Sequence, residues 1–171
     1  VAHALFKGAL FMVAGLIDHE AGTRDVRKLG GLRTAMPITF AAACLAAISM
    51  AGLPPFIGFM AKEEIYYAIA KPDAWSIAIT VLTIVGNALM LVIGAAVAIL
   101  PFLGRKIETP KHAHEGPILL WLGPIVLSVI GLLSAIFAGY TNHSFISPMA
   151  SAIAGDAVSA KAAIVFHIGV P

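Results

Sequence analysis

Four titratable side chains lie in or beside strongly apolar stretches of the chain: His3, Lys7, Lys62 and Glu63. Ionisable residues inside membrane segments are rare and mark ion or proton pathways. His3 and Lys7 stand four residues apart and therefore share one face of a helix. A lysine in a low-dielectric interior can lose its proton near neutral pH, where an imidazole also titrates. The pattern predicts a relay that passes protons between side chains.

Lys62, which we expect to be the central residue of this site, follows a break in the apolar segment 36–70. Gly52, Pro54 and Pro55 interrupt that segment, and each proline lacks an N–H and clashes with the preceding turn. Main-chain groups freed at membrane depth survive only where protein or a water-filled cavity satisfies them. We therefore expect a broken helix of the kind that ion pathways use.

Structural roles for the same residues stay open. Lys7 and Lys62 can extend from the ends of their helices to the headgroup region. Glu63 and its neighbour Glu64 are equally consistent with relay partners and with surface acids. His3 is equally consistent with a relay and with a hydrogen-bonded contact between helices.

Composition assigns the chain to the integral membrane proteins. Of its 171 residues 60% are hydrophobic and 12% are charged, and the mean hydropathy is +0.94. An average soluble domain has roughly 25% charged residues. The formal net charge of +2, without a basic run that includes aromatic residues, argues against a nucleic-acid partner. The single cysteine, Cys44, forms no intrachain disulfide.

The elements that must position the site are apolar helices. We predict them at residues 1–17, 36–70, 75–103 and 117–140. The last two are uncharged and exceed the roughly 20 residues that span a bilayer. Asn87 is expected to bond to a neighbouring helix. The fold class is therefore an all-α integral membrane protein, a transmembrane helix bundle with one broken helix.

We expect two parts in the chain. Residues 1–140 form the membrane module, and residues 141–171 form a linker and the start of a further helix. The chain begins inside one apolar stretch and ends soon after another begins, which is typical of a piece of a longer protein.

Two polar connections, residues 18–35 and 104–116, hold seven of the eleven Lys and Arg residues. Two membrane crossings separate them, so both should lie on the same side of the membrane. The positive-inside rule places that side in the cytoplasm.

These connections also contain histidines and acids in short clusters. Their spacing matches no standard zinc pattern, so we predict no metal site and interpret them as the composition of solvated loops. The clusters are Asp18-His19-Glu20 and His112-x-His114-Glu115.

Several motifs are familiar. They are HALFKGALFM at residues 3–12, DHEAGTRD at 18–25, RKLGGL at 27–32, Met36-Pro37, GLPPF at 52–56, Gly58-Phe59 and Lys62-Glu63. Together they closely resemble the antiporter-like subunits of the Mrp cation/proton antiporters. In looser form they resemble the proton-pumping subunits of the membrane arm of respiratory complex I. The resemblance covers about the first 70 residues, and the motif at 18–25 is most similar to the A-type subunit of Mrp.

The resemblance implies a 14-helix antiporter module built from inverted repeats, of which this chain supplies the last four helices. It also implies that Lys62 is the key lysine of the second broken helix, and that His3 and Lys7 lie on the polar axis leading to it. Ala61 stands where the family often has serine.

The function implied is a transporter, not an enzyme, in a bacterial inner membrane. It would exchange Na⁺ or another monovalent cation for H⁺, driven by the proton motive force, with no bound cofactor. Its partners would be membrane lipid and other subunits of the Mrp B to G type. Two alternatives stay open: a proton-pumping subunit of complex I or a related membrane hydrogenase, and a scaffold subunit without its own ion path.

Overall fold

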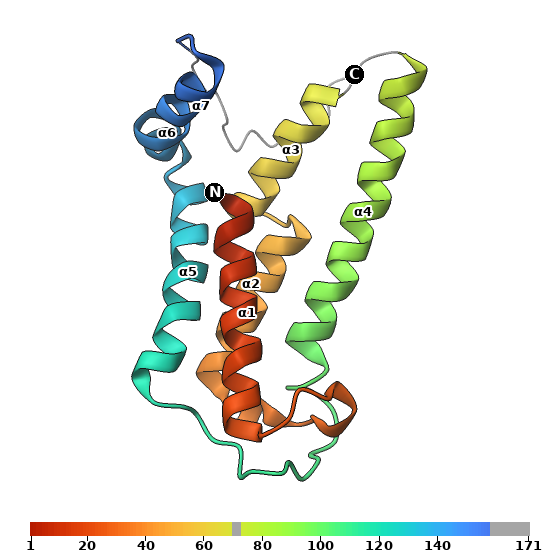
Figure 1. Ribbon diagram of the computed structural model, residues 1–171, viewed down its shortest axis with the longest axis vertical. Coiled ribbons are helices and arrows are strands. Elements are labelled where there is room, and N and C mark those ends of the chain that lie inside the picture. The colour runs from red at the N-terminus through yellow and green to blue at the C-terminus, as the bar shows by residue number, and fades with distance from the viewer. Residues whose placement is uncertain (70–72, 158–171) are drawn as a thin grey trace.

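The computed structural model describes residues 1–69 and 73–157, which form helices, turns and loops without a β-strand (Figure 1). The all-α prediction is therefore confirmed for this part of the chain. The longer helices are α1 (Ala2–Ala21), α2 (Pro37–Ala51), α3 (Ile57–Ile69), α4 (Ala74–Ile99) and α5 (Ile118–Ile136). The shorter elements are the 3₁₀ turns η1 (Val26–Lys28) and η2 (Leu32–Thr34), α6 (Ala138–Thr141), the π-helical turn η3 (Asn142–Ile146) and α7 (Ser147–Ala154).

Local sequence signals set several helix ends. At the end of α1, Gly22 has a φ of 73° and its N–H donates to Asp18 O at 2.9 Å. This left-handed cap favours glycine. Pro37 occupies the first turn of α2, where its missing N–H costs nothing. The Asp73 carboxylate accepts from the main-chain N–H of Ser76 at 2.9 Å and so begins α4.

Two predicted boundaries differ from the structure, and a third prediction falls outside the described residues. The first helix continues through residues 18–21, because no helix-breaking residue occurs before Gly22. The predicted helix 117–140 divides at Phe137 into α5 and α6. The further helix expected within 141–171 corresponds to residues 162–170, which lie outside the described residues.

Helix α2 is the centre of the bundle and packs against α1, α4 and α5. Its buried face is made of small side chains, which let neighbouring helix backbones approach closely. These residues are Ala42, Ala43, Ala46 and Ala47. From α5, the Ser128 hydroxyl donates to Ala42 O at 3.4 Å. These small residues therefore allow close approach of the neighbouring helices, while Met50 is the large apolar side chain on the same buried face.

The two polar connections, now residues 22–36 and 100–117, lie together at one end of the bundle (Figure 1). Three main-chain bonds join them: Leu32 N to Pro101 O at 3.2 Å, Arg33 N to Phe102 O at 3.1 Å, and Ile107 N to Gly30 O at 3.3 Å. Their location at the same end agrees with the number of crossings predicted between them.

Two of the described helices, α4 and α5, are long and apolar enough to cross a membrane. Most of α4 is exposed, including many large apolar side chains. Such a surface is suited to lipid or to other protein, and not to water.

Candidate functional site

The chain turns sharply between α2 and α3, over residues 52–56. Gly52 has a φ of 75°, in the left-handed region that favours glycine, and its N–H donates to Ser49 O at 3.1 Å. The two prolines predicted to interrupt the helix, Pro54 and Pro55, lie in this turn and are joined by a cis peptide bond. The structure thus places two separate helices where the sequence predicts a break.

Lys62 closes the end of α2. Its Nζ donates to Met50 O at 2.8 Å and to Ala51 O at 2.9 Å. In a continuous helix these carbonyls would accept from the N–H groups of the residues four positions later. Those residues are Pro54 and Pro55, which have no N–H. The lysine side chain therefore supplies the two donors that the prolines remove.

The position of Lys62 also suits its charge. The C-terminal end of a helix carries a partial negative charge, which stabilises a nearby cation. Hydrogen bonds from an ammonium group to carbonyl oxygens are stronger than bonds between neutral groups. An ammonium has three donors, and the two carbonyls of α2 use two of them. One N–H of Lys62 is left for a water molecule or another acceptor.

Close packing fixes this joint between the helices. A Cβ on Gly52 would overlap Lys62 Cδ, and a Cβ on Gly58 would overlap the main-chain oxygen of Ser49. Gly58 and Lys62 lie four residues apart on one face of α3, which therefore rests directly on the last turn of α2. The Ser49 hydroxyl is buried beside this contact and has no hydrogen-bond partner among the described residues.

The other predicted relay residues lie apart from this joint. His3 is exposed, with its ring centroid 5.2 Å from that of Phe6, and Lys7 Nζ is 5.9 Å from the ring centroid of Phe11. In the described part of the chain, no hydrogen bond or ion pair joins any two of His3, Lys7, Lys62 and Glu63.

The two glutamates after Lys62 differ in their surroundings. Both are exposed, but Glu64 lines a cavity of about 260 Å³ between α3 and the turn η3, together with Ala61 and Asn142. Glu63 does not line it. The sequence predicted a relay role for Glu63. It could not distinguish the two acids, because which of them lines the cavity depends on the face of α3 that meets the bundle.

Asn87 bonds to a neighbouring helix, as predicted. Its Nδ2 donates to the Tyr66 hydroxyl oxygen at 2.6 Å and so joins α4 to α3. This polar contact lies on a helix whose other side chains are almost all apolar.

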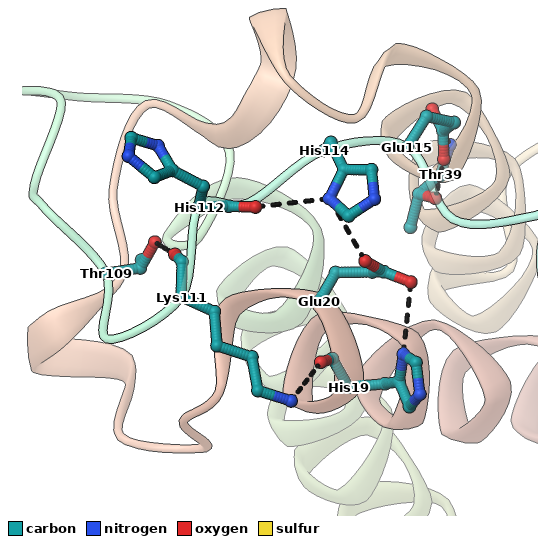
Figure 2. A network of polar contacts seen from close by, with 8 residues as sticks. All are labelled: His19, Glu20, Thr39, Thr109, Lys111, His112, His114 and Glu115. Atoms are coloured by element: carbon teal, nitrogen blue, oxygen red, sulfur yellow. Dashed lines mark hydrogen bonds and ion pairs between the residues drawn. The ribbon is translucent and has the colours of Figure 1, made fainter.

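A second polar cluster lies at the opposite end of α2 (Figure 2). Glu20, in the last turn of α1, has a side chain only 5% exposed, and its two carboxylate oxygens face different histidines. Oε1 is 3.0 Å from His19 Nδ1, and Oε2 is 3.2 Å from His114 Nδ1. Lys111 Nζ donates to His19 O at 3.1 Å.

Glu115 caps the beginning of α2. One carboxylate oxygen accepts from Ile38 N at 2.8 Å, and the other accepts a short hydrogen bond from the Thr39 hydroxyl (Figure 2). Our interpretation of these acids and histidines as solvated loop composition is therefore wrong for the buried Glu20 and for Glu115, whereas His114 is an exposed loop residue that also contacts Glu20. No group of three His, Cys, Asp or Glu residues in the described chain is placed to hold a metal ion.

Residues 1–89 match the family described as NADH:quinone oxidoreductase/Mrp antiporter, TM. The chain belongs to this family. As a member of it, this is a membrane protein, which agrees with the composition and with the apolar surface of α4. The matched residues of the NADH:quinone oxidoreductase/Mrp antiporter family include Lys62 and the turn before it, whereas His114 and Glu115 lie outside them.

Curated relatives extend the family similarity along the chain. The Na⁺/H⁺ antiporter subunit A1 of Staphylococcus haemolyticus (strain JCSC1435) is 42% identical over 165 residues, which cover 91% of this chain and 20% of the relative. The subunit A1 of Staphylococcus aureus (strain MRSA252) is 40% identical over 163 residues, 90% of this chain and 20% of the relative. The chain thus spans about a fifth of the length of these relatives.

A solved structure shares the fold. A chain in the structure of the Mrp complex from Dietzia sp. DQ12-45-1b aligns with a TM-score of 0.67 and 29% identity. The alignment covers 98% of this chain and 18% of that chain.

Proposed function

We propose that this chain is part of an A-type subunit of a multisubunit Mrp antiporter, which exchanges Na⁺ or another monovalent cation for H⁺ using the proton motive force. The family, the names of the curated relatives and the similarity to a chain of an Mrp complex support this proposal. The protein would then be a secondary transporter without a bound cofactor.

The observation that carries the proposal is the pair of hydrogen bonds from Lys62 to Met50 O and Ala51 O. A proton on this amine adds a charge and a third donor at the end of α2. Loss of the proton leaves a neutral amine, which binds the two carbonyls less strongly. Protonation of Lys62 is therefore coupled to the strength of the joint between α2 and α3, as a proton-carrying group in a transporter requires.

The relay would include the other predicted residues. Lys7 and Lys62 would alternate in charge, with His3 between Lys7 and the rest of the subunit. Glu63 would exchange protons with Lys62 from the following position of α3. Water molecules must complete this path, because the described side chains do not contact one another directly.

The wider architecture follows from the same proposal. Helices α2 and α3 would form one broken crossing of the membrane, and residues 1–140 would be the C-terminal part of a 14-helix module of inverted repeats. Residues 141–171 would link it to a further helix. The membrane would be a bacterial inner membrane with residues 18–35 and 104–116 in the cytoplasm, and the partners would be subunits of the Mrp B to G type.

Cation-induced recovery of a proton gradient in everted vesicles tests the proposal, with the full complex and its assembly checked on a native gel. Arginine keeps the charge and the donors of Lys62 but does not release its proton. We expect Lys62→Ala and Lys62→Arg to assemble and to lose the recovery, while Lys28→Ala, on the exposed turn η1, retains it.

Other outcomes would contradict the proposal. Recovery retained in assembled Lys62→Arg would mean that the lysine holds the helices together without carrying a proton, as in a scaffold subunit. No cation-dependent recovery in the unmodified complex, together with co-purifying redox subunits, would favour the complex I or hydrogenase alternative.

A further inference from the structure

Glu20 is a buried carboxylate without a permanent positive partner. It lies in the last turn of α1, where the partial negative charge of the helix end disfavours an anion. No lysine or arginine among the described residues forms an ion pair with it. A buried charge in this setting requires compensation from a neighbour.

The neighbours that face Glu20 are two imidazoles. His19 and His114 are 66% and 72% exposed, so both can exchange protons with the aqueous phase. Imidazole is the side chain that ordinarily changes its charge between pH 5 and 8. Among the residues that the structure describes, proton uptake by one of these imidazoles is the available means of balancing an ionised Glu20.

Both imidazoles meet Glu20 through their Nδ1 atoms. The Nδ1 of His114 donates to His112 O at 3.1 Å and lies 3.2 Å from Glu20 Oε2, an ion-pair distance. The Nδ1 of His19 forms a hydrogen bond with Glu20 Oε1 at 3.0 Å. A proton added to either ring therefore places a positive charge beside the buried carboxylate.

We propose that His19, Glu20 and His114 form a proton-binding site at this end of the bundle, and that the bound proton fastens the segment 104–117 to the end of α1. The ligand is H⁺ itself. With Glu20 ionised, the net charge of the three side chains is −1 with both imidazoles neutral, 0 with one proton bound and +1 with two.

The surrounding charged groups are engaged elsewhere. Asp18 of α1 pairs with Arg24 at 2.8 Å. From the segment 104–117, Lys111 Nζ binds the main-chain oxygen of His19, and the Glu115 carboxylate binds the start of α2. The ring of His112 points away from Glu20 (Figure 2). Protonation of the two histidines is thus the local means of balancing Glu20.

The site lies where it can affect helix packing. His114 directly precedes Glu115, which caps α2, and it is four residues before the start of α5. A stronger bond between His114 and Glu20 would hold the beginnings of α2 and α5 against the end of α1. Proton uptake is thereby connected to three helices of the bundle.

Hydrogen exchange tests the site without reference to transport. The assembled full-length complex would be exchanged at pH 6 and pH 8, with rates in peptides covering residues 105–117 corrected for the intrinsic effect of pH. We expect protection at pH 6 to exceed that at pH 8 roughly fivefold, because a bond between two charged groups is stronger than one with a neutral imidazole. His112→Gln, in the same segment, is the matched control and should retain this difference.

His114→Gln and Glu20→Gln should reduce the difference in protection between pH 6 and pH 8 to less than about twofold, since neither variant can form an ion pair between residues 20 and 114. His114→Gln changes an exposed side chain, so it decides the matter even if Glu20→Gln fails to assemble. The proposal would be overturned if His114→Gln kept the full difference in protection between pH 6 and pH 8. It would also be overturned if His112→Gln lost that difference. Because no ion exchange is measured, failure here is distinct from failure of the antiport proposal.

Discussion

Lys62 Nζ lies 2.8 Å from the main-chain oxygen of Met50, where a continuous helix would place the N–H of residue 54. Residue 54 is a proline, so the side chain replaces a main-chain donor. The charge of one lysine and the stability of one helix end therefore depend on each other. This relationship leads directly to two predictions about stability, apart from any effect on transport.

Replacing Lys62 by alanine should destabilise the complex as well as inactivate it. The carbonyls of the buried Met50 and the half-buried Ala51 would lose their donors, and one unsatisfied buried group costs about 1 to 3 kcal/mol. We expect a lower apparent Tm in a thermal-shift assay of the purified complex. Lys62→Arg should restore most of the lost Tm, because its guanidinium can donate to the same carbonyls. Equal Tm values for Lys62→Ala and the unmodified complex would show that the lysine does not close the helix.

Gly52→Ala should also weaken the joint. A non-glycine residue at a φ of 75° costs about 1 to 3 kcal/mol, and the new Cβ would displace Lys62 from its position. The matched control is Gly86→Ala in α4, where nothing lies within 4 Å of the added Cβ. That change should be neutral or slightly stabilising, since glycine within a helix is unfavourable relative to alanine. Similar losses of Tm in both variants would contradict the role of Gly52.

Signals that act over a few residues predicted the break in the apolar segment. Gly52, Pro54 and Pro55 identify it, and the structure has two helices, α2 and α3, on either side of these residues. The apolar setting of Lys62 drew attention to this lysine, whose central role stays a prediction. The same signals do not show which carbonyls the lysine contacts. That contact depends on how α3 folds back onto α2. The structure shows that this fold requires glycine at position 58, where a Cβ would overlap the main-chain oxygen of Ser49, but the sequence alone does not show the requirement.

Contacts between distant residues were not predictable in this way. Glu20 and His114 are 94 positions apart, and they meet because the segment after α4 crosses the ends of α1 and α2. The burial of Glu20 was also not predicted, because the sequence pattern placed residues 18–35 in a polar connection, whereas α1 extends to Ala21 and has Glu20 on its buried face. The one available clue was the absence of any helix-breaking residue before Gly22.

The bond between Asn87 and Tyr66 should stabilise the pairing of α4 with α3. Polar bonds between membrane helices contribute about 0.6 kcal/mol on average, with a maximum near 1.7. A double-mutant cycle of Asn87→Leu and Tyr66→Phe, measured by unfolding of the purified complex, should give a coupling energy in this range. Strictly additive effects would mean that the two side chains do not interact in the assembled protein.

Glu115→Ala should destabilise the beginning of α2, although Glu115 is distant from it in sequence. The carboxylate accepts from Ile38 N at 2.8 Å, so its removal leaves an N–H at the helix start without a partner. Loss of such a cap typically costs about 1 kcal/mol. Glu108→Ala is the matched control, because this acid is exposed in the same segment. We expect a lower apparent Tm and faster amide exchange at residues 38 and 39 in Glu115→Ala alone. Unchanged exchange at both positions would mean that another group caps α2 in the complex.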